Sequence, residues 1–248
     1  MMCASTRRGE SGPGRPRGRP RGRPRLSEGA PVLTREAIAA TALAIAGAEG
    51  FAAVTMQRLS GDLGVTPRAL YNHIENRQEV IDLAAGLMLR SIPAPRLDPA
   101  TWQDSLRTAY VEGRQAYRSF PRALLLSLEE TVTAGEIDPA RITLAEDMLA
   151  FFTKIGLTLA QAAAARTGFL IDLFGFVLLI DHRHDQAPPS ARAGLTQPVP
   201  RPWLDAHPEV PAPLSRQAAQ VPPPTTDEMF EALVDSRIAA IAHQLAHR

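Results

Sequence analysis

Apolar residues recur every three or four positions along most of the chain, which is the spacing of amphipathic helices. The apolar face over residues 34–49 consists of Ile38, Ala42, Ile45 and Ala46. Gly50 follows this face and is suited to end the helix. We therefore predict an all-α fold that begins with this helix.

Two short helices joined by a tight turn are predicted within residues 51–81. Thr55 can cap the first of them, whose apolar positions are Met56, Leu59 and Leu63. Gly64 stands where the chain must turn sharply, because glycine tolerates positive φ. Thr66 can cap the second helix, with Pro67 at the first position, where a missing N–H costs nothing. Such a pair is typical of a helix-turn-helix that reads DNA.

The rest of the chain is also predicted to be helical. Asn76 opens a helix over 76–91, with Glu79 placed to complete a variant capping box. Further helices are predicted over 98–119, 122–131, 138–155, 158–184 and 226–247. Residues 185–225 hold 11 of the 22 prolines and are predicted to be mostly loop. The predicted regions are a tail (1–30), a helix-turn-helix domain (31–92) and a helical core (93–248).

The predicted helices 158–184 and 226–247 are strongly apolar. Their apolar positions are Phe169, Leu170, Leu173, Phe174, Val177 and Leu178 on the first, and Ile238, Ile241 and Leu245 on the second. A helix that is apolar nearly all round must be buried, either within the subunit or against a partner. The run 168–180 is interrupted by Asp172 and is too short to span a bilayer, so no membrane partner is expected.

Composition agrees with a helical protein that has a sizeable core. The chain has 248 residues, of which 45% are hydrophobic and 5% aromatic. Cys3 is the single cysteine, which excludes a disulfide framework and suits a reducing cytoplasm. The sequence shows no glycine-rich phosphate loop, no zinc spacing and no Ser/His/Asp motif. We therefore expect a protein that is not an enzyme and needs no metal or other cofactor.

Charge is concentrated in the amino-terminal tail. Residues 1–26 contain eight arginines and one acid, Glu10, so their charge is +7 and the rest of the chain carries −6 to give the net +1. A segment rich in arginine, glycine and proline cannot build a core and is predicted to be disordered. Its repeats resemble AT-hook cores, in which arginines enter the narrow minor groove, here Arg17, Arg19, Arg21 and Arg23. The alternative is a basic tail that adds only non-specific attraction to DNA.

The region 42–77 resembles the DNA-binding signature of the TetR family of bacterial transcriptional regulators. The matching positions are Ala42, Gly50, Phe51, Thr55, Met56, Leu59, Leu63, Gly64, Val65, Leu70, Tyr71, Asn72, His73, Ile74, Asn76 and Arg77. The resemblance implies base contacts from Gln57, Pro67, Arg68, Ala69 and Asn72. It implies phosphate contacts from Thr55, Tyr71, His73 and Arg77. Tyr71 and His73 could instead serve only within the domain.

The same resemblance implies how such a protein works. A homodimer would pack its two apolar helices into a four-helix bundle, and its two heads would read a palindrome in double-stranded DNA. A small-molecule effector in the core would release a repressor from its operator. The alternatives are that both helices serve only the monomer core, and that the protein is an architectural binder of AT-rich DNA that relies on the arginine arm.

The core resembles, more weakly, the branch that contains the tetracycline repressor. The positions that match drug and metal contacts in that branch are Pro93, Ala109, Gly113 and Leu179, which lack the polar and histidine groups. We therefore expect a more apolar pocket than one for magnesium-bound tetracycline. The candidate pocket residues are Trp102, Phe151, Phe152, Arg166, Phe169 and Asp172. The alternative for each is an ordinary place in the core.

Overall fold

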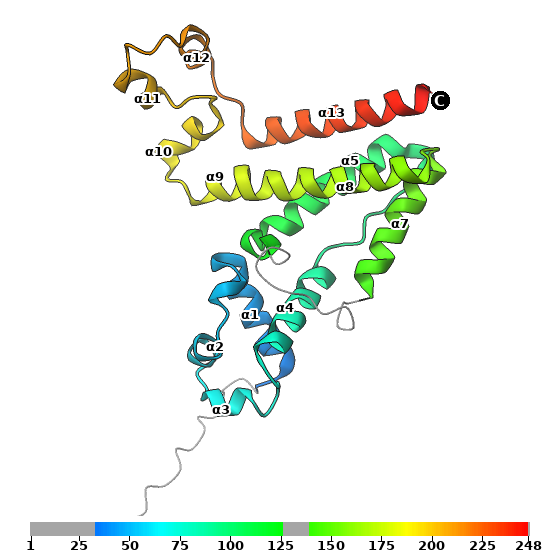
Figure 1. Ribbon diagram of the computed structural model, residues 1–248, viewed down its shortest axis with the longest axis vertical. Helices are drawn as coiled ribbons and strands as arrows, with labels where there is room; N and C mark the ends of the chain where they lie inside the picture. The colour runs from blue at the N-terminus through cyan, green and yellow to red at the C-terminus, as the bar shows by residue number, and fades with distance from the viewer. Residues whose placement is uncertain (1–32, 126–138, 248) are drawn as a thin grey trace, which may run out of the picture. The chain divides into compact units, whose positions relative to one another are not determined.

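The computed structural model describes residues 33–125 and 139–247 (Figure 1). Within these ranges the regular elements are all helical, so the predicted all-α class is confirmed. The amino-terminal tail lies outside the described residues, as does the part of the predicted helix 122–131 that follows Leu125. Leu33–Arg248 forms one compact unit, so the predicted domain boundary near residue 92 stays a prediction.

Four helices form the amino-terminal part of this unit: α1 (Arg35–Glu49), α2 (Met56–Asp62), α3 (Pro67–Leu70) and α4 (Arg77–Ser91). Each begins at a side-chain cap, and the capping residues are Thr34, Thr55, Thr66 and Asn76. These caps satisfy backbone N–H groups that the first turn of a helix leaves without partners. The predicted caps at Thr55, Thr66 and Asn76 are therefore confirmed.

Two glycines make the bends in this part of the chain. Gly50 has φ 93° after α1, and Gly64 has φ 66° between α2 and α3. Both angles lie in the region that favours glycine over residues with a Cβ. The capping box at α4 differs slightly from the prediction, because the Glu79 carboxylate accepts the backbone N–H of Glu75 rather than that of Asn76.

A hydrophobic cluster joins α1 to α4, and we call it the head cluster. Its fully buried side chains include Ile38, Phe51, Leu59, Leu70 and Ile81. Burying one such side chain stabilises the fold by about 1.5–3 kcal/mol. Each short helix contributes a buried leucine, so α2 and α3 are held by α1 and α4 rather than by their own hydrogen bonds.

A second hydrophobic cluster lies among the later helices, and we call it the core cluster. Its main elements are α5 (Trp102–Arg118), α7 (Ala140–Lys154), α8 (Leu159–Phe176) and α13 (Thr226–Ala246). Thr158 and Thr225 each form a complete capping box at the start of α8 and of α13. Gly156, with φ 110°, follows the end of α7, in agreement with the predicted helix end at residue 155.

Residues 185–225 contain more structure than the predicted loop. The short helices here are α10 (Pro189–Arg192), α11 (Arg201–Ala206) and α12 (Pro213–Ala218). Proline stands in the first turn of α11 and α12, where its fixed φ favours a helix. The Arg216 guanidinium donates hydrogen bonds to three backbone carbonyl groups, those of Leu204, His207 and Val210. The prediction of a mostly loop segment was wrong because several prolines in this segment begin short helices instead of interrupting them.

The longest apolar helix is continuous from Leu159 to Gln186. It consists of α8, a π-helical turn (Val177–Asp181) and α9 (His182–Gln186), and runs beside α13 in Figure 1. With 28 residues it is long and apolar enough to cross a membrane, by length and composition alone. The prediction that the apolar run is too short to span a bilayer therefore does not hold for the complete helix. Only 28% of its most apolar stretch is buried within the described residues.

Candidate nucleic-acid interface and ligand cavity

Helix α3 presents polar side chains to solvent while one leucine anchors it. Leu70 is completely buried in the head cluster, whereas Pro67, Arg68 and Asn72 are exposed. Tyr71 is 53% exposed, which is high for a large aromatic residue. Ala69 is half-buried. The turn at Gly64 thus positions a short helix that has one face exposed to solvent. Contacts with base edges in a major groove require such an exposed face.

The arginines near this face differ in their partners. Arg58, beside the exposed Gln57, forms ion pairs with Glu49 at 3.0 Å and Asp62 at 2.9 Å. Arg68 makes no ion pair with any described residue, so its guanidinium is available to a ligand. This contrast favours Arg68 over Arg58 as a base-reading group, as the family resemblance implies.

Arg77 is used within the fold. Its Nε donates to the carbonyl oxygen of Val54 at 2.7 Å, and its Nη2 donates to that of Phe51 at 2.8 Å. These bonds hold the segment between α1 and α2 against the start of α4. The geometry therefore favours a structural role for Arg77 over the phosphate contact that the resemblance implies.

Thr55 and His73 also have roles within the fold. The Thr55 hydroxyl accepts the backbone N–H of Arg58 at 3.1 Å. The carbonyl oxygen of the half-buried His73 accepts a hydrogen bond from Arg35 at 2.8 Å. The first bond does not use the hydroxyl hydrogen of Thr55, and the second does not use the imidazole ring of His73. The phosphate contacts predicted for these two residues therefore stay predictions.

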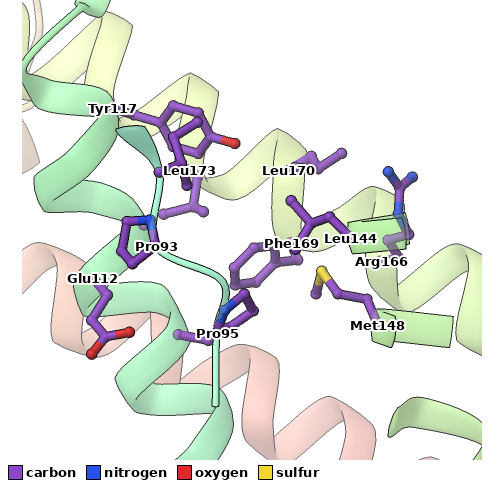
Figure 2. Close-up of a pocket in the computed structure, with 13 residues that line it drawn as sticks. Pro93, Pro95, Glu112, Tyr117, Leu144, Met148, Arg166, Phe169, Leu170 and Leu173 are labelled. Carbon is purple, nitrogen blue, oxygen red and sulfur yellow. The ribbon is translucent and has the colours of Figure 1, made fainter. Parts of the chain in front are cut away.

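A hollow opens among α5, α7, α8 and the segment that follows α4 (Figure 2). The volume of this hollow is about 450 Å³, which includes the part that is open to solvent. The lining residues are Ile92, Pro93, Pro95, Ala109, Glu112, Gly113, Tyr117, Leu144, Met148, Arg166, Phe169, Leu170 and Leu173. Mostly apolar walls with a few polar groups are the usual composition of a small-molecule site.

The six predicted pocket residues separate into two groups in the structure. Arg166 and Phe169 line the hollow. Phe151 and Phe152 are buried in the core cluster, with ring centroids 5.3 Å apart, and Trp102 packs against the same cluster. Asp172 accepts hydrogen bonds from Tyr110 and Arg237 and lies outside this lining.

The candidate pocket residues omitted one helical face of α5, from which the resemblance had pointed only to Ala109 and Gly113 and had missed Glu112 and Tyr117. Ala109, Glu112, Gly113 and Tyr117 stand at positions i, i+3, i+4 and i+8 of α5. That spacing was visible in the sequence and would have identified the face. Pro93, Ala109 and Gly113, which match ligand-contact positions of the tetracycline repressor branch, do line the hollow, whereas Leu179 is 64% exposed and lies outside it.

The polar groups of the hollow have distinct environments. Burial raises the pKa of the Tyr117 hydroxyl, and the positive charges of Arg141 and Arg166 partly oppose this shift. The Nε of Arg166 is buried and has no hydrogen-bond partner among the described residues. Glu112 is half-buried and lies at the opposite end of the lining from Arg166 in Figure 2.

Buried and partly buried ion pairs connect helices of the core. Asp181, which is completely buried, accepts two hydrogen bonds from Arg114, at 2.7 and 2.8 Å. The Arg114 guanidinium also lies over the rings of Phe176 and Phe230. Asp172 is bound by both Nε and Nη2 of Arg237, each at 2.8 Å. These pairs join α5 to the π-helical turn after α8, and α8 to α13, and are structural.

This arrangement of a short exposed helix, a connecting helix and a helical core with a cavity is the fold of TetR-family transcriptional regulators. ActR from Streptomyces coelicolor in complex with actinorhodin superposes with a TM-score of 0.62 at 22% identity, covering 86% of this chain and 98% of that one. TetR from Acinetobacter baumannii gives a TM-score of 0.54 at 23% identity, covering 86% and 98%. The predicted resemblance to this family is confirmed at the level of the fold.

A curated relative is similar in sequence as well. The chain is 26% identical over 153 residues to the HTH-type transcriptional repressor DrrR1 from Streptomyces coeruleorubidus, a match over 60% of this chain. The matched region spans about half (52%) of the length of that relative. No family model matches the chain. The relatives named here are regulators of transcription rather than enzymes.

Proposed function

We propose that this chain is a cytoplasmic DNA-binding repressor that binds a palindromic operator as a homodimer and leaves it when an effector occupies the core. The observation that carries the proposal is the presentation of α3, a short helix anchored by the buried Leu70 and otherwise exposed. The similarity to the repressor DrrR1 supports the repressor role.

The exposed face of α3, together with the turn that follows it, is the proposed reading surface. Pro67, Arg68, Ala69 and Asn72 contact base edges, and Gln57 adds a contact from α2. Arg68 makes no ion pair with a described residue, so its guanidinium can donate two hydrogen bonds to the edge of a guanine. Thr55, Tyr71 and His73 bind phosphates and set the register of docking.

The proposed dimer uses the two outer helices. On the continuous helix 159–186, Ile171 is 65% exposed and Leu179 is 64% exposed, so the described residues leave part of its apolar surface uncovered. The carboxylates of Asp172 and Asp181 are paired with arginines of α13 and α5, which ties the helix into a bundle with these two helices. A second copy of α8 and α13 would cover the remaining apolar surface.

Effector binding is proposed to act through the segment after α4. Ile92, Pro93 and Pro95 line the hollow and directly follow α4, which begins close after α3. A neighbouring hollow, lined among others by Leu89 and Ala94, gives this segment room to shift. A molecule in the hollow would therefore displace α4 and change the spacing of the two heads. The complex of ActR with actinorhodin supports ligand binding in this fold.

The arginine arm is proposed to strengthen binding through the minor groove beside the operator. Its candidate residues, Arg17, Arg19, Arg21 and Arg23, lie outside the described residues. Contacts of this kind favour AT-rich flanks, where the narrow groove concentrates negative potential.

The test is a map of the sites that the purified full chain binds in fragmented DNA of its source genome, repeated with residues 1–26 deleted. A short palindrome near a few promoters, retained by the deleted protein at lower affinity, is the expected result. Diffuse enrichment over AT-rich DNA that disappears with the tail would overturn the repressor proposal in favour of an architectural protein.

A further inference from the structure

The hollow is apolar along its length and charged at its ends. Phe169, Leu170 and Leu173 from α8 and Leu144 and Met148 from α7 are among its apolar walls (Figure 2). Arg166 stands at one end of the lining and Glu112 at the other. A molecule that fills such a space buries an apolar body and meets one positive and one negative side chain.

Arg166 differs from the other arginines that pack on the core helices. Arg114 is paired with Asp181, Arg118 with Asp185 and Arg237 with Asp172. Arg166 has no carboxylate partner among the described residues, and its Nε is buried without an acceptor. A buried donor without an acceptor is unfavourable, so an acceptor supplied by a bound molecule would be stabilised here.

On the basis of the effector cavity proposed above, we infer that the effector is an apolar, largely aromatic molecule with a single acidic group, which Arg166 binds. The aromatic and proline side chains of Phe169, Tyr117, Pro93 and Pro95 suit flat rings. The guanidinium of Arg166 suits a carboxylate, sulfonate or phenolate because it can offer two parallel N–H donors. Glu112 repels a second acid at the other end, so a diacid is disfavoured.

A matched pair of fluorescent probes tests this inference on the full chain. Anilinonaphthalene sulfonate carries an aromatic body and one acidic group, and N-phenylnaphthylamine is the same ring skeleton without the sulfonate. Their dissociation constants are measured by fluorescence for the wild type, Arg166→Gln and Arg166→Lys. Arg201→Gln, at an exposed arginine of α11 outside the hollow, is the matched control.

The expected result is a selective loss of affinity for the acidic probe. Arg166→Gln weakens binding of the sulfonate about tenfold or more and leaves binding of the neutral probe within about twofold. Arg166→Lys retains part of the affinity for the sulfonate because it keeps the charge. Arg201→Gln changes neither probe. Leu144→Trp, which fills the hollow from α7, weakens both probes.

Three results would overturn the inference. The sulfonate binds Arg166→Gln as tightly as the wild type, both probes weaken equally in Arg166→Gln, or both bind Leu144→Trp unchanged. Operator binding by Arg166→Gln separates this failure from failure of the proposed function. A variant that keeps the palindrome but shows no charge selectivity refutes the acidic effector alone, whereas a wild type without a palindrome refutes the repressor.

Discussion

The head cluster and the core cluster place their charged groups in opposite ways. In the head, the ion pairs of Arg58 are on the surface, and the buried positions are almost entirely aliphatic or aromatic. In the core, Asp181 is completely buried with Arg114, and Asp172 is bound by Arg237 and Tyr110. The polar groups of the head are thus exposed on its surface. The charged groups of the core instead form ion pairs that join helices around the hollow.

This difference predicts how strongly a substitution of a polar residue destabilises each cluster. Helices of the head start at threonine or asparagine caps that act within three residues, such as the bond from the N–H of Arg58 to Thr55. The ion pairs of the core join residues more than sixty positions apart, such as Arg114 and Asp181. Local caps are worth about 1 kcal/mol each, whereas loss of one member of a buried pair costs several times more.

The largest effect is expected from removing the buried acid of the core. Asp181→Ala leaves the Arg114 guanidinium without its main partner and should lower the free energy of unfolding by about 3–5 kcal/mol. Asp235→Ala, which removes the exposed partner of Arg107, should cost less than about 1 kcal/mol. Chemical denaturation of both variants measures the contrast. Equal losses would show that burial of the pair does not matter.

A cavity in the head cluster should give the next largest effect. Leu59 is completely buried, so Leu59→Ala should lower the stability of the head by about 2–5 kcal/mol. Operator binding should fall much more than binding of a fluorescent probe in the hollow. Equal loss of both activities would mean that the two clusters unfold as one cooperative unit and would break the comparison.

Loss of the free arginine of α3 should affect DNA binding without affecting stability. Arg68→Ala should weaken operator binding by about 1–3 kcal/mol and relax specificity at one base pair. Its free energy of unfolding should stay within about 0.5 kcal/mol of the wild type, because the side chain makes no ion pair with the described residues. Arg201→Ala is the control. Unchanged affinity in a quantitative gel shift would remove Arg68 from the reading surface.

Removal of one cap should have a modest effect confined to the head. Thr55→Ala removes the acceptor for the N–H of Arg58 and should cost about 1 kcal/mol. Thr55→Ser keeps the hydroxyl and should recover most of that loss. Thermal denaturation of the pair gives the stability, and a serine variant as unstable as alanine would contradict a capping role.

The smallest effect is expected from acid titration of the head. The backbone N–H of Glu75, with help from Arg35, lowers the pKa of the Glu79 carboxyl below its ordinary 4.5. A lowered folded-state pKa gives stability that is present above the unfolded value and is lost as the pH falls through the folded value. Glu79→Gln should therefore be less stable than the wild type near neutral pH, and the difference should shrink as the pH falls below 4.5. A gap in denaturation midpoint that is constant over this range would refute this assignment.

Some of the fold was predictable because its determinants are close together in the sequence. The caps at Thr55, Thr66 and Asn76 and the turns at Gly50 and Gly64 act over a few residues, and the structure has them as predicted. The candidate pocket was only partly predictable. Apolar aromatic residues suit both a core and a cavity wall, so Phe151 and Phe169 look alike in sequence but only Phe169 lines the hollow.

The sequence by itself therefore determined the long helices and the two short helices of the helix-turn-helix, because hydrophobic periodicity, capping and glycine conformation are local properties. It did not determine the short helices within residues 185–225. The tertiary structure alone decided which charges meet and which stay free. Asp172 and Arg166 are both charged residues on α8, yet packing gives Asp172 the Arg237 of α13 and leaves the Nε of Arg166 without an acceptor among the described residues. That distinction depends on how distant helices cross, which no local pattern contains.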